Sequence, residues 1–428
     1  MNKFMYVVLS LLAAASAHAA AIEQVIVRQQ WPWSTDVKVE YRISGIDAQH
    51  PVNLGVRAYN GDVELDASRL EESITGDRYG ICESGVGQFI IDPVKAFGTE
   101  KVALANFKVK LTLSESDANA NEVIYKIFDL DPENLNPNGT FKCTDVTRAD
   151  IKNKHYGDFE TDYNQLFAGA NSTVANQLIW TGVTNNPAYK TTKLVMRKIP
   201  AGTFSMGQTG GSFTGSGNAE QVHGVTLTKD FFIGVFPVTQ EQYRKLTRGV
   251  WNGSGHKGEA FPVENASYEA FQSVVTNGIA ANLGVPANYP TEAQWECACR
   301  AGTSSELYTG VALSSSHLDP IAWHSGNSNN NTCEVGLKLP NAYGLYDMIG
   351  NVYEACCDAH KAASLVAGYA DGSALSDPQV EGPSGGGNYV IRGGYFGLNN
   401  YLLTSAGRNG HAGNWTACGF RLAFTVTE

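Results

Sequence analysis

Positive charge is the first thing this sequence lacks. Its 31 Lys and Arg residues stand against 42 Asp and Glu residues, which gives a formal net charge of -11 at pH 7. A chain of this sign repels phosphate backbones and anionic membranes, so we expect no nucleic-acid partner. Charged residues of both signs make up only 17% of the chain, while glycine contributes 45 of 428 residues. This composition favours short strands and many turns.

Long hydrophobic runs are missing as well, since no stretch approaches the ~20 apolar residues of a membrane-spanning helix. A shorter apolar run, Val7–Ala15, follows Asn2 and Lys3 and precedes the small residues of Ala17-His18-Ala19. This order is typical of a secretory signal peptide and its cleavage site. We therefore expect residues 1–19 to be removed, and the mature chain to be secreted or periplasmic without inserting into a membrane.

Cysteine is nearly absent from the first 290 residues, which contain only Cys82 and Cys143. Because an exported protein meets an oxidising compartment, we predict a disulfide between these two residues, with two free buried thiols as the alternative. The other cysteines are Cys297, Cys299, Cys333, Cys356, Cys357 and Cys418. No spacing among them matches a zinc knuckle or ribbon. Their pairing stays open, and we expect these thiols to be structural rather than reactive.

Apolar and polar residues alternate through the first part of the chain, most clearly in 37–43, 52–58 and 107–113. A period of two places all apolar side chains of a strand on one face. Because no helical period separates these strands, the pattern predicts an antiparallel β-sandwich accessory domain over residues 20–129. Such a domain serves as a spacer or a binding module, and its fold does not say which.

Residues 130–190 are rich in Asn, Asp, Thr and Pro without a sustained period, which predicts an irregular connector. The second domain, residues 191–428, mixes short strands with helices, so the chain as a whole is of the α+β class. Thr239–Gln242 and Thr291–Gln294 have the sequence of capping boxes, which begin helices by satisfying their first N–H groups. Apolar residues at helical spacing predict a further helix from Tyr268.

Six sequence blocks follow one another in the second domain. They are Ile199–Gly207, Pro237–Tyr243, Pro290–Glu296, Asn341–Glu354, Arg392–Gly394 and Gly419–Arg421. Together they resemble the formylglycine-generating enzyme, or sulfatase-modifying factor, family over residues 192–426. The resemblance implies a variant C-type-lectin-like fold with little regular secondary structure.

Oxidases of that family, as the resemblance implies, convert a sulfatase cysteine into formylglycine with oxygen and a copper ion held by two cysteines. The pair follows the Arg-Gly-Gly block and precedes an arginine, and here the corresponding residues, 395–408, include no cysteine. Two further departures are Tyr395, where the oxidases have serine, and Tyr353, where they have tryptophan. Because soft thiolates select Cu(I), we expect neither copper nor a catalytic residue of that kind.

One metal site of the family has a counterpart here. The resemblance implies a structural calcium ion held by side-chain oxygens of Asp347 and Glu354 and by the carbonyl oxygens of Gly350 and Val352. Oxygen atoms are the ligands that a hard cation prefers. In the alternative, Asp347 only caps a turn and Glu354 pairs with an arginine.

These observations favour a secreted, non-catalytic recognition protein that uses the loops of the family fold. The candidate contact residues are Tyr353, Tyr395, Asn399, Asn400, Arg408 and Trp415; the three aromatic residues among them could instead belong to the core. The expected partner is a protein or an extended peptide, or else a glycan. Two alternatives stay open: an oxidase for sulfatase maturation with unfamiliar metal ligands, and a structural component of the cell envelope.

Overall fold

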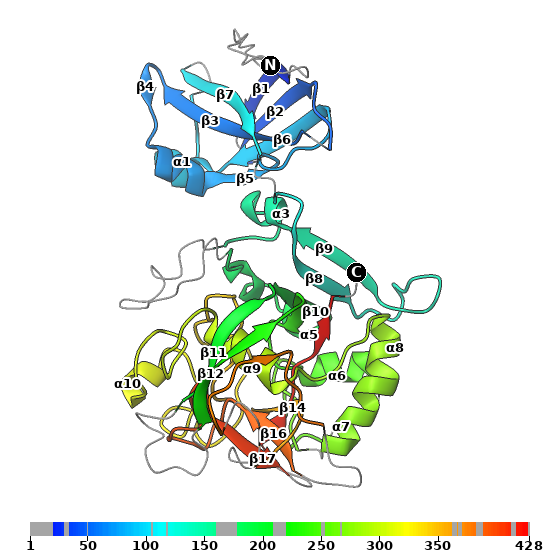
Figure 1. Ribbon diagram of the computed structural model, residues 1–428. Helices are drawn as coiled ribbons and strands as arrows, with labels where there is room; N and C mark the ends of the chain where they lie inside the picture. The colour runs from blue at the N-terminus through cyan, green and yellow to red at the C-terminus, as the bar shows by residue number, and fades with distance from the viewer. Residues whose placement is uncertain are drawn as a thin grey trace. The chain divides into compact units, whose positions relative to one another are not determined.

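A computed structural model describes most of the chain (Figure 1). The described residues are 20–29, 34–48, 50–103, 106–116, 119–159, 178–208, 220–249, 253–265, 268–361, 366, 370–381, 388–411 and 417–426. The expected signal peptide, residues 1–19, lies outside them. None of the described helices has the length and apolar character needed to cross a membrane.

The chain forms two compact units and passes between them three times. The first unit consists of Met1–Glu122 and Thr147–Gly157, and the second of Val123–Val146 and Asp158–Glu428. The crossings therefore follow Glu122, Val146 and Gly157. The second unit thus receives a segment of chain from within the first.

The first unit contains seven described strands and three short helices. The strands are β1 Ala21–Gln29, β2 Val37–Ser44, β3 Val52–Asn60, β4 Val63–Glu64, β5 Ile74–Gly76, β6 Gly85–Ile91 and β7 Phe107–Glu115. The helices are α1 Ala67–Ser73, α2 Pro93–Phe97 and α3 Arg148–Lys152.

These strands form two antiparallel sheets with the orders β1-β2-β6-β5 and β4-β3-β7. Val37, Val39, Tyr41 and Ile43 of β2 are all buried, and they share one core with Leu54 and other residues of the second sheet. The alternation in the sequence therefore predicted both the strands and their inner faces. The antiparallel sheets at the N-terminus are confirmed.

Segment Thr147–Gly157 returns to the first unit and is held there by polar contacts. Oδ1 of Asn153 accepts hydrogen bonds from the main-chain N–H groups of Arg78 and Tyr79, at 2.6 and 2.9 Å. The imidazole of His155 lies between two carboxylates, with Nδ1 3.2 Å from Asp150 and Nε2 2.8 Å from Asp77. Hydrogen bonds to Asp150 and Asp77 raise the pKa of His155 to about 9. The ring is therefore cationic at neutral pH and bridges the two acids.

The second unit has more elements, and most of them are short. Its strands are β8 Val123–Asp129, β9 Lys142–Thr147, β10 Lys193–Ile199, β11 Gly202–Gln208, β12 Glu220–Leu227, β13 Phe231–Gly234, β14 Tyr353–Ala359, β15 Leu375–Ser376, β16 Tyr389–Arg392, β17 Arg408–His411, β18 Cys418–Gly419 and β19 Ala423–Thr425. Its helices are η1 Thr181–Thr184, α5 Ala188–Thr191, α6 Gln240–Leu246, α7 Tyr268–Val274, η3 Val275–Ile279, α8 Ala280–Leu283, α9 Glu292–Arg300 and α10 Ser315–Leu318.

Three small sheets organise this unit, with the orders β19-β13-β10-β8-β9, β11-β12-β15 and β17-β16-β14-β18. Both capping boxes are confirmed: Thr239 caps α6 and Thr291 caps α9, each accepting from the N–H three residues on. The expected helix from Tyr268 is α7, which continues through a π-turn into α8. The α+β class with sparse regular structure is therefore also confirmed.

Two expectations differ from the structure. Strand β8, which we placed in the first domain, pairs with β10 of the second unit, and residues 130–146 of the expected connector include β9 of the same sheet. The predicted disulfide is also wrong, because Cys82 and Cys143 are both free thiols. These two cysteines belong to different units, which their isolation in the sequence could not reveal.

Candidate binding site

Two arginines mark the base of a long hairpin loop in the second unit. Strand β16 ends at Arg392 and β17 begins at Arg408, and these residues are direct partners in the antiparallel ladder. Residues 393–407 form the loop between them. Both side chains are buried, with exposed fractions of 0% for Arg392 and 1% for Arg408. Buried guanidinium groups need partners that compensate their lost hydration.

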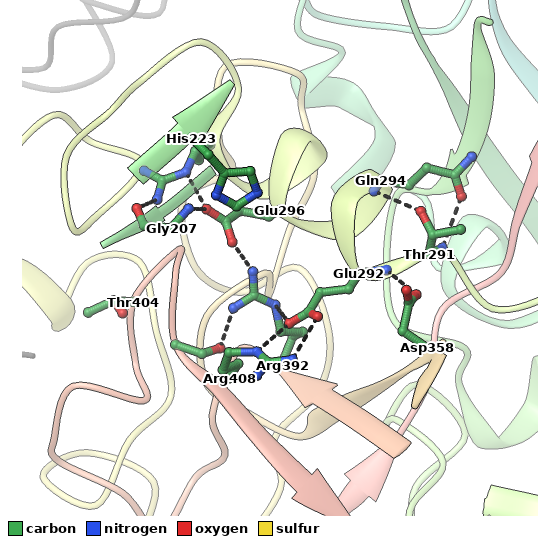
Figure 2. A network of polar contacts seen from close by, with 12 residues as sticks. Gly207, His223, Thr291, Glu292, Gln294, Glu296, Asp358, Arg392, Thr404 and Arg408 are labelled. Atoms are coloured by element: carbon green, nitrogen blue, oxygen red, sulfur yellow. Dashed lines mark hydrogen bonds and ion pairs between the residues drawn. The ribbon is translucent and has the colours of Figure 1, made fainter. Parts of the chain in front are cut away.

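Helix α9 supplies these partners. Nε and Nη2 of Arg408 donate to the two carboxylate oxygens of Glu292, both at 2.9 Å, and Nη2 of Arg392 donates to Glu296 (Figure 2). Nη1 of Arg392 also donates to the carbonyl oxygen of Gly407 at 2.9 Å. Because Glu292 and Glu296 are four residues apart on one helix face, a single helix holds both ends of the loop.

Charges are balanced around these glutamates. Nε of Arg300 donates to Glu296 at 2.8 Å. Burial alone would raise the pKa of Glu296, but Arg300 and Arg392 hold it below its usual value, so this carboxylate is charged at neutral pH. Asp358 accepts from the main-chain N–H of Glu292 at 2.7 Å. Burial and the nearby Glu292 raise the pKa of Asp358 to about 7.

Main-chain hydrogen bonds fix the course of the loop between its two ends. The N–H of Phe396 donates to the carbonyl of Asn351 at 3.0 Å, and the N–H of Ser405 donates to the carbonyl of Glu306 at 2.8 Å. A loop anchored in this way is ordered before it meets a partner. Such order reduces the entropy lost on binding.

A second loop lies against the first. The N–H of Ser325 donates to the carbonyl of Leu398, and the hydroxyl of Ser328 donates to the carbonyl of Phe396, both at 2.9 Å. We call residues 325–331 and 395–401 the paired loops. Neither contains Lys, Arg, His, Asp or Glu, although the whole chain carries a net charge of -11.

Side-chain amides form most of the exposed part of the paired loops. The exposed residues of this kind are Asn329, Asn330, Asn331, Asn399 and Asn400. Asn329 and Asn330 have φ angles of 55° and 57°, in the left-handed region that asparagine adopts more readily than most residues. Among the described residues, none hydrogen-bonds the side-chain amides of Asn329, Asn330 or Asn399.

The candidate contact residues divide into three groups. Asn399 and Asn400 are exposed and Tyr395 is half-buried, so these three remain available. Tyr353, 1% exposed, packs its ring 5.3 Å from that of Tyr395, and Arg408 is buried against α9. Our expectation of a surface role was wrong for these two, because one belongs to the aromatic core and the other to a buried ion pair. Trp415 lies outside the described residues.

Sequence reasoning missed the loop 325–331. Its run Asn329-Asn330-Asn331 is visible in the sequence, but nothing local places it beside residues 395–401, some 65 positions later. The hydrogen bonds of Ser325 and Ser328 show this proximity. The sequence feature that could have linked the two segments is that both are rich in asparagine and lack charged residues.

The turn expected to hold calcium gives a mixed result. Oδ2 of Asp347 accepts from the N–H of Gly336 at 2.7 Å, while its Oδ1 is buried without a hydrogen-bond partner among the described residues, as a cation ligand would be. Burial raises the pKa of Asp347 to about 6. Glu354 fits less well, because Nε and Nη2 of Arg421 bind its two oxygens at 2.6 and 2.7 Å.

Glu354 also accepts a hydrogen bond from the indole Nε1 of Trp295 at 2.7 Å. The arginine pairing that we left open as an alternative is therefore present for this residue. Gly350 and Val352 are buried and could offer only their carbonyl oxygens. Within the part of the chain that the structure describes, no three His, Cys, Asp or Glu side chains could together hold a metal ion.

All eight cysteines are free thiols. Burial raises the pKa values of Cys297, Cys299 and Cys418 to about 12, so these sulfurs are protonated at neutral pH. The thiolate is the form that attacks substrates and binds soft metals. The side chains of Cys299 and Cys418 are buried and pack within the core.

The sequence and structure of this chain are similar to those of known proteins. A family model described as a sulfatase-modifying factor enzyme 1-like domain matches residues 183–426, more than half of the chain. The chain belongs to this family. The resemblance based on the six sequence blocks is thereby confirmed, and with it the fold of the second unit.

Several proteins that are similar to this chain carry different names. The chaperone protein LppX of Paenibacillus barcinonensis is 30% identical over 200 residues, which are 35% of this chain and 70% of that protein. The serine/threonine-protein kinase pkn1 of Chlamydia pneumoniae is 30% identical over 216 residues, which are 46% of this chain but only 32% of the kinase. The match thus spans about a third of that kinase.

The formylglycine-generating enzyme of Mus musculus is 35% identical over 83 residues, 16% of this chain and 21% of that enzyme. Among solved structures, Treponema denticola variable protein 1 is 26% identical with a TM-score of 0.46, covering 54% of this chain and 95% of that one. PvdO from Pseudomonas aeruginosa is also 26% identical, with a TM-score of 0.44, over 54% of this chain and 94% of that one.

Proposed function

We propose that this protein is a non-catalytic recognition protein that binds a macromolecular partner through the paired loops. The observation that carries the proposal is the composition of these loops, which consist almost entirely of Asn, Ser, Gly and Tyr with no charged residue. Binding surfaces of antibodies are enriched in the same residues, which combine rigid contact area with adaptable hydrogen bonding.

The scaffold beneath the loops supports the same proposal. Arg392 and Arg408 are fixed on α9 by buried carboxylates, and Ser325 and Ser328 tie the second loop to the first. A contact surface on rigid supports loses little freedom on binding. The proposal includes export of the chain, as its first residues indicate.

An oxidase role receives less support from the same region. Residues 395–407 offer no thiol, and Arg408, which follows them, is engaged by the carboxylate of Glu292 and the carbonyl oxygen of Lys361. The proposal therefore excludes copper, while a structural calcium ion at Asp347 remains part of it. The unpartnered Oδ1 of that carboxylate supports the ion.

The experiment compares the purified chain with a triple variant, Asn329→Ala, Asn330→Ala and Asn399→Ala. Both are immobilised and exposed to surface extracts of the producing cells. Partners retained by the wild type at least tenfold better than by the variant would support the proposal. Equal retention, or oxygen-dependent aldehyde formation on a Cys-x-Pro-x-Arg peptide in the presence of copper, would contradict it.

A further inference from the structure

A cleft of about 510 Å³ lies in the first unit, where the returning segment Thr147–Gly157 meets the loop 77–84 between β5 and β6. Its walls include side chains of β2, of this loop and of α3. The volume is in the range of small-molecule sites. Every lining residue belongs to the first unit, so the cleft is complete within that unit.

The loop 77–84 is fixed by hydrogen bonds to neighbouring segments. The main-chain groups of Ile81 exchange two hydrogen bonds with those of Val52, both at 2.9 Å. The hydroxyl of Ser84 accepts from the N–H of Ile46 and donates to the carbonyl of the same residue, also at 2.9 Å. A wall that is ordered in this way loses little freedom when a ligand binds.

The wall of the cleft is acidic. Its charged residues are Asp77, Glu83, Asp150 and His155, and no described lysine or arginine lines it. Burial would raise the pKa of Asp150, but hydrogen bonds from His155 and Thr147 hold it below its usual value. Because His155 is cationic at neutral pH, three carboxylates and one imidazolium leave the wall with two negative charges.

Two of these carboxylates have oxygens free for a ligand. Glu83 is exposed and forms no hydrogen bond or ion pair with a described residue. Asp77 binds His155 through Oδ1 at 2.8 Å, and its Oδ2 has no partner among the described residues. Both ring nitrogens of His155 are taken by Asp77 and Asp150, so the imidazolium offers no donor to an anion. The wall therefore offers acceptors, which suit a cationic donor.

Apolar side chains lie among the acids. Ile81 and Tyr79 are half-buried, and Val86 is 65% exposed although it is large and hydrophobic. Tyr41 packs its ring against Gly87, where an added Cβ would come 2.3 Å from the ring. Methylene groups of a ligand would gain free energy by covering this surface.

We propose that this cleft binds a small aliphatic diamine. Its two ammonium groups pair with the carboxylates of Asp77 and Glu83, and its methylene chain lies on the apolar residues between the acids. Two positive charges neutralise the wall, whereas a neutral or anionic ligand leaves it unpaired. This site lies in a different unit from the paired loops and does not depend on the proposed function.

The test titrates the purified full chain with 1,6-diaminohexane in 20 mM NaCl, followed by calorimetry. The matched ligand is 1,6-hexanediol, which has the same chain without charge. We expect the diol to bind about a hundredfold more weakly, because it cannot form charge-assisted hydrogen bonds. Raising NaCl to 300 mM should weaken diamine binding about tenfold through screening.

A cysteine in the cleft reports where the diamine binds. Cys82 is a half-buried free thiol of the lining, whereas Cys143 is an exposed free thiol of the second unit. Saturating diamine should slow alkylation of Cys82 by N-ethylmaleimide about tenfold, because a bound ligand restricts access to the thiol. The alkylation rate of Cys143 should not change.

Variants of the chain test the role of charge. Glu83→Gln keeps the size of the side chain and removes its charge, and no contact with a described residue is lost. We expect this variant to bind the diamine about tenfold more weakly. Glu100→Gln is the matched control, because Glu100 is an exposed residue of the first unit outside the lining. This control should bind as the wild type does.

Equal binding of the diamine and the diol, or of the diamine to wild type and Glu83→Gln, would overturn the site. Unchanged alkylation of Cys82 at saturating diamine would place the ligand elsewhere and overturn it as well. A lysine-containing peptide that binds at least tenfold better than the diamine would show that the ammonium group belongs to a protein, and would overturn the free diamine as ligand. None of these results would change the case for the paired loops.

Discussion

The first unit pairs its buried main chain in β-ladders around an apolar core, whereas the second unit also uses buried arginines to bind main-chain carbonyls. Among the described residues of the first unit, the only buried charged side chain is Arg78. In the second unit, Arg300, Arg392, Arg408 and Arg421 are all buried. Each donates to at least one main-chain carbonyl as well as to a carboxylate.

Arg421 shows how one buried arginine binds both a carboxylate and main-chain carbonyls. Beyond its two bonds to Glu354, its guanidinium donates to the carbonyls of Gly234 at 2.7 Å and Tyr346 at 3.0 Å. Buried carbonyls outside regular ladders need a donor, and a five-donor guanidinium can serve several at once. Where a fold has little regular structure, buried ion pairs thus replace part of the ladder.

We expect the largest loss of stability when the ion pair between Arg421 and Glu354 is broken. Arg421→Met leaves Glu354 buried without its cation, and we expect the second unit to lose about 3–5 kcal/mol of unfolding free energy. Urea unfolding followed by hydrogen exchange of each unit measures the loss. The double variant Arg421→Met/Glu354→Leu should lose less, because no lone charge remains. A double variant as unstable as the single one would show that the carbonyl contacts, not the ion pair, matter most.

Truncation of a core side chain tests the unfolding free energy of the first unit. Leu54 is 1% exposed and belongs to the shared core of both sheets. Leu54→Ala should cost about 3 kcal/mol, through lost burial and a residual cavity. Hydrogen exchange should show the loss in the first unit alone. An equal loss in the second unit would show that the two units unfold together.

Calcium should act on the second unit only. If Asp347 contributes to a calcium site, adding the ion at about a hundred times its Kd stabilises that unit by about 2.7 kcal/mol. Thermal unfolding with calcium, with magnesium and with a chelator measures the shift. Asp347→Asn should abolish the calcium response, and a response that survives in this variant would place the ion elsewhere.

The smallest effect is a pH dependence confined to the first unit. Because the folded pKa of His155 is raised to about 9, from an ordinary value near ~6.5, its contribution is complete below pH ~6.5 and is lost as pH rises through 9. The imidazole is 34% exposed, so screening reduces the contribution to about 1 kcal/mol. The difference in unfolding free energy between wild type and His155→Asn should shrink between pH 6.5 and 9.5; a constant difference would exclude the bridge.

Local patterns were sufficient where the cause of a structure is local. The capping boxes at Thr239 and Thr291 and the alternation in β2 each predicted the element that forms. The sheet of β8 was not predictable in this way, because no local feature of its sequence indicates its partner β10, which comes 70 positions later.

Burial was the main quantity that the sequence did not supply for the site. Tyr353 and Arg408 have side chains that suit a contact surface, yet the second unit buries both among partners distant in sequence. Asn399 and Asn400 were predicted correctly as exposed, whereas their neighbours in 325–331 required the three-dimensional arrangement. The family motifs indicated which part of the sequence forms the loop, but only the tertiary contacts show which of its residues are exposed.

The three crossings of the chain limit how this protein can be divided. A protease that cuts once, between Glu122 and Val123, leaves both fragments carrying pieces of the first unit, because Thr147–Gly157 follows the cut. Truncation at that point would also strip Asp77 of its His155 and deprive Arg78 of Asn153. For the same reason, a recombinant that keeps the first unit on its native chain must carry β8 and β9 along, because Val123–Val146 lies between its two pieces.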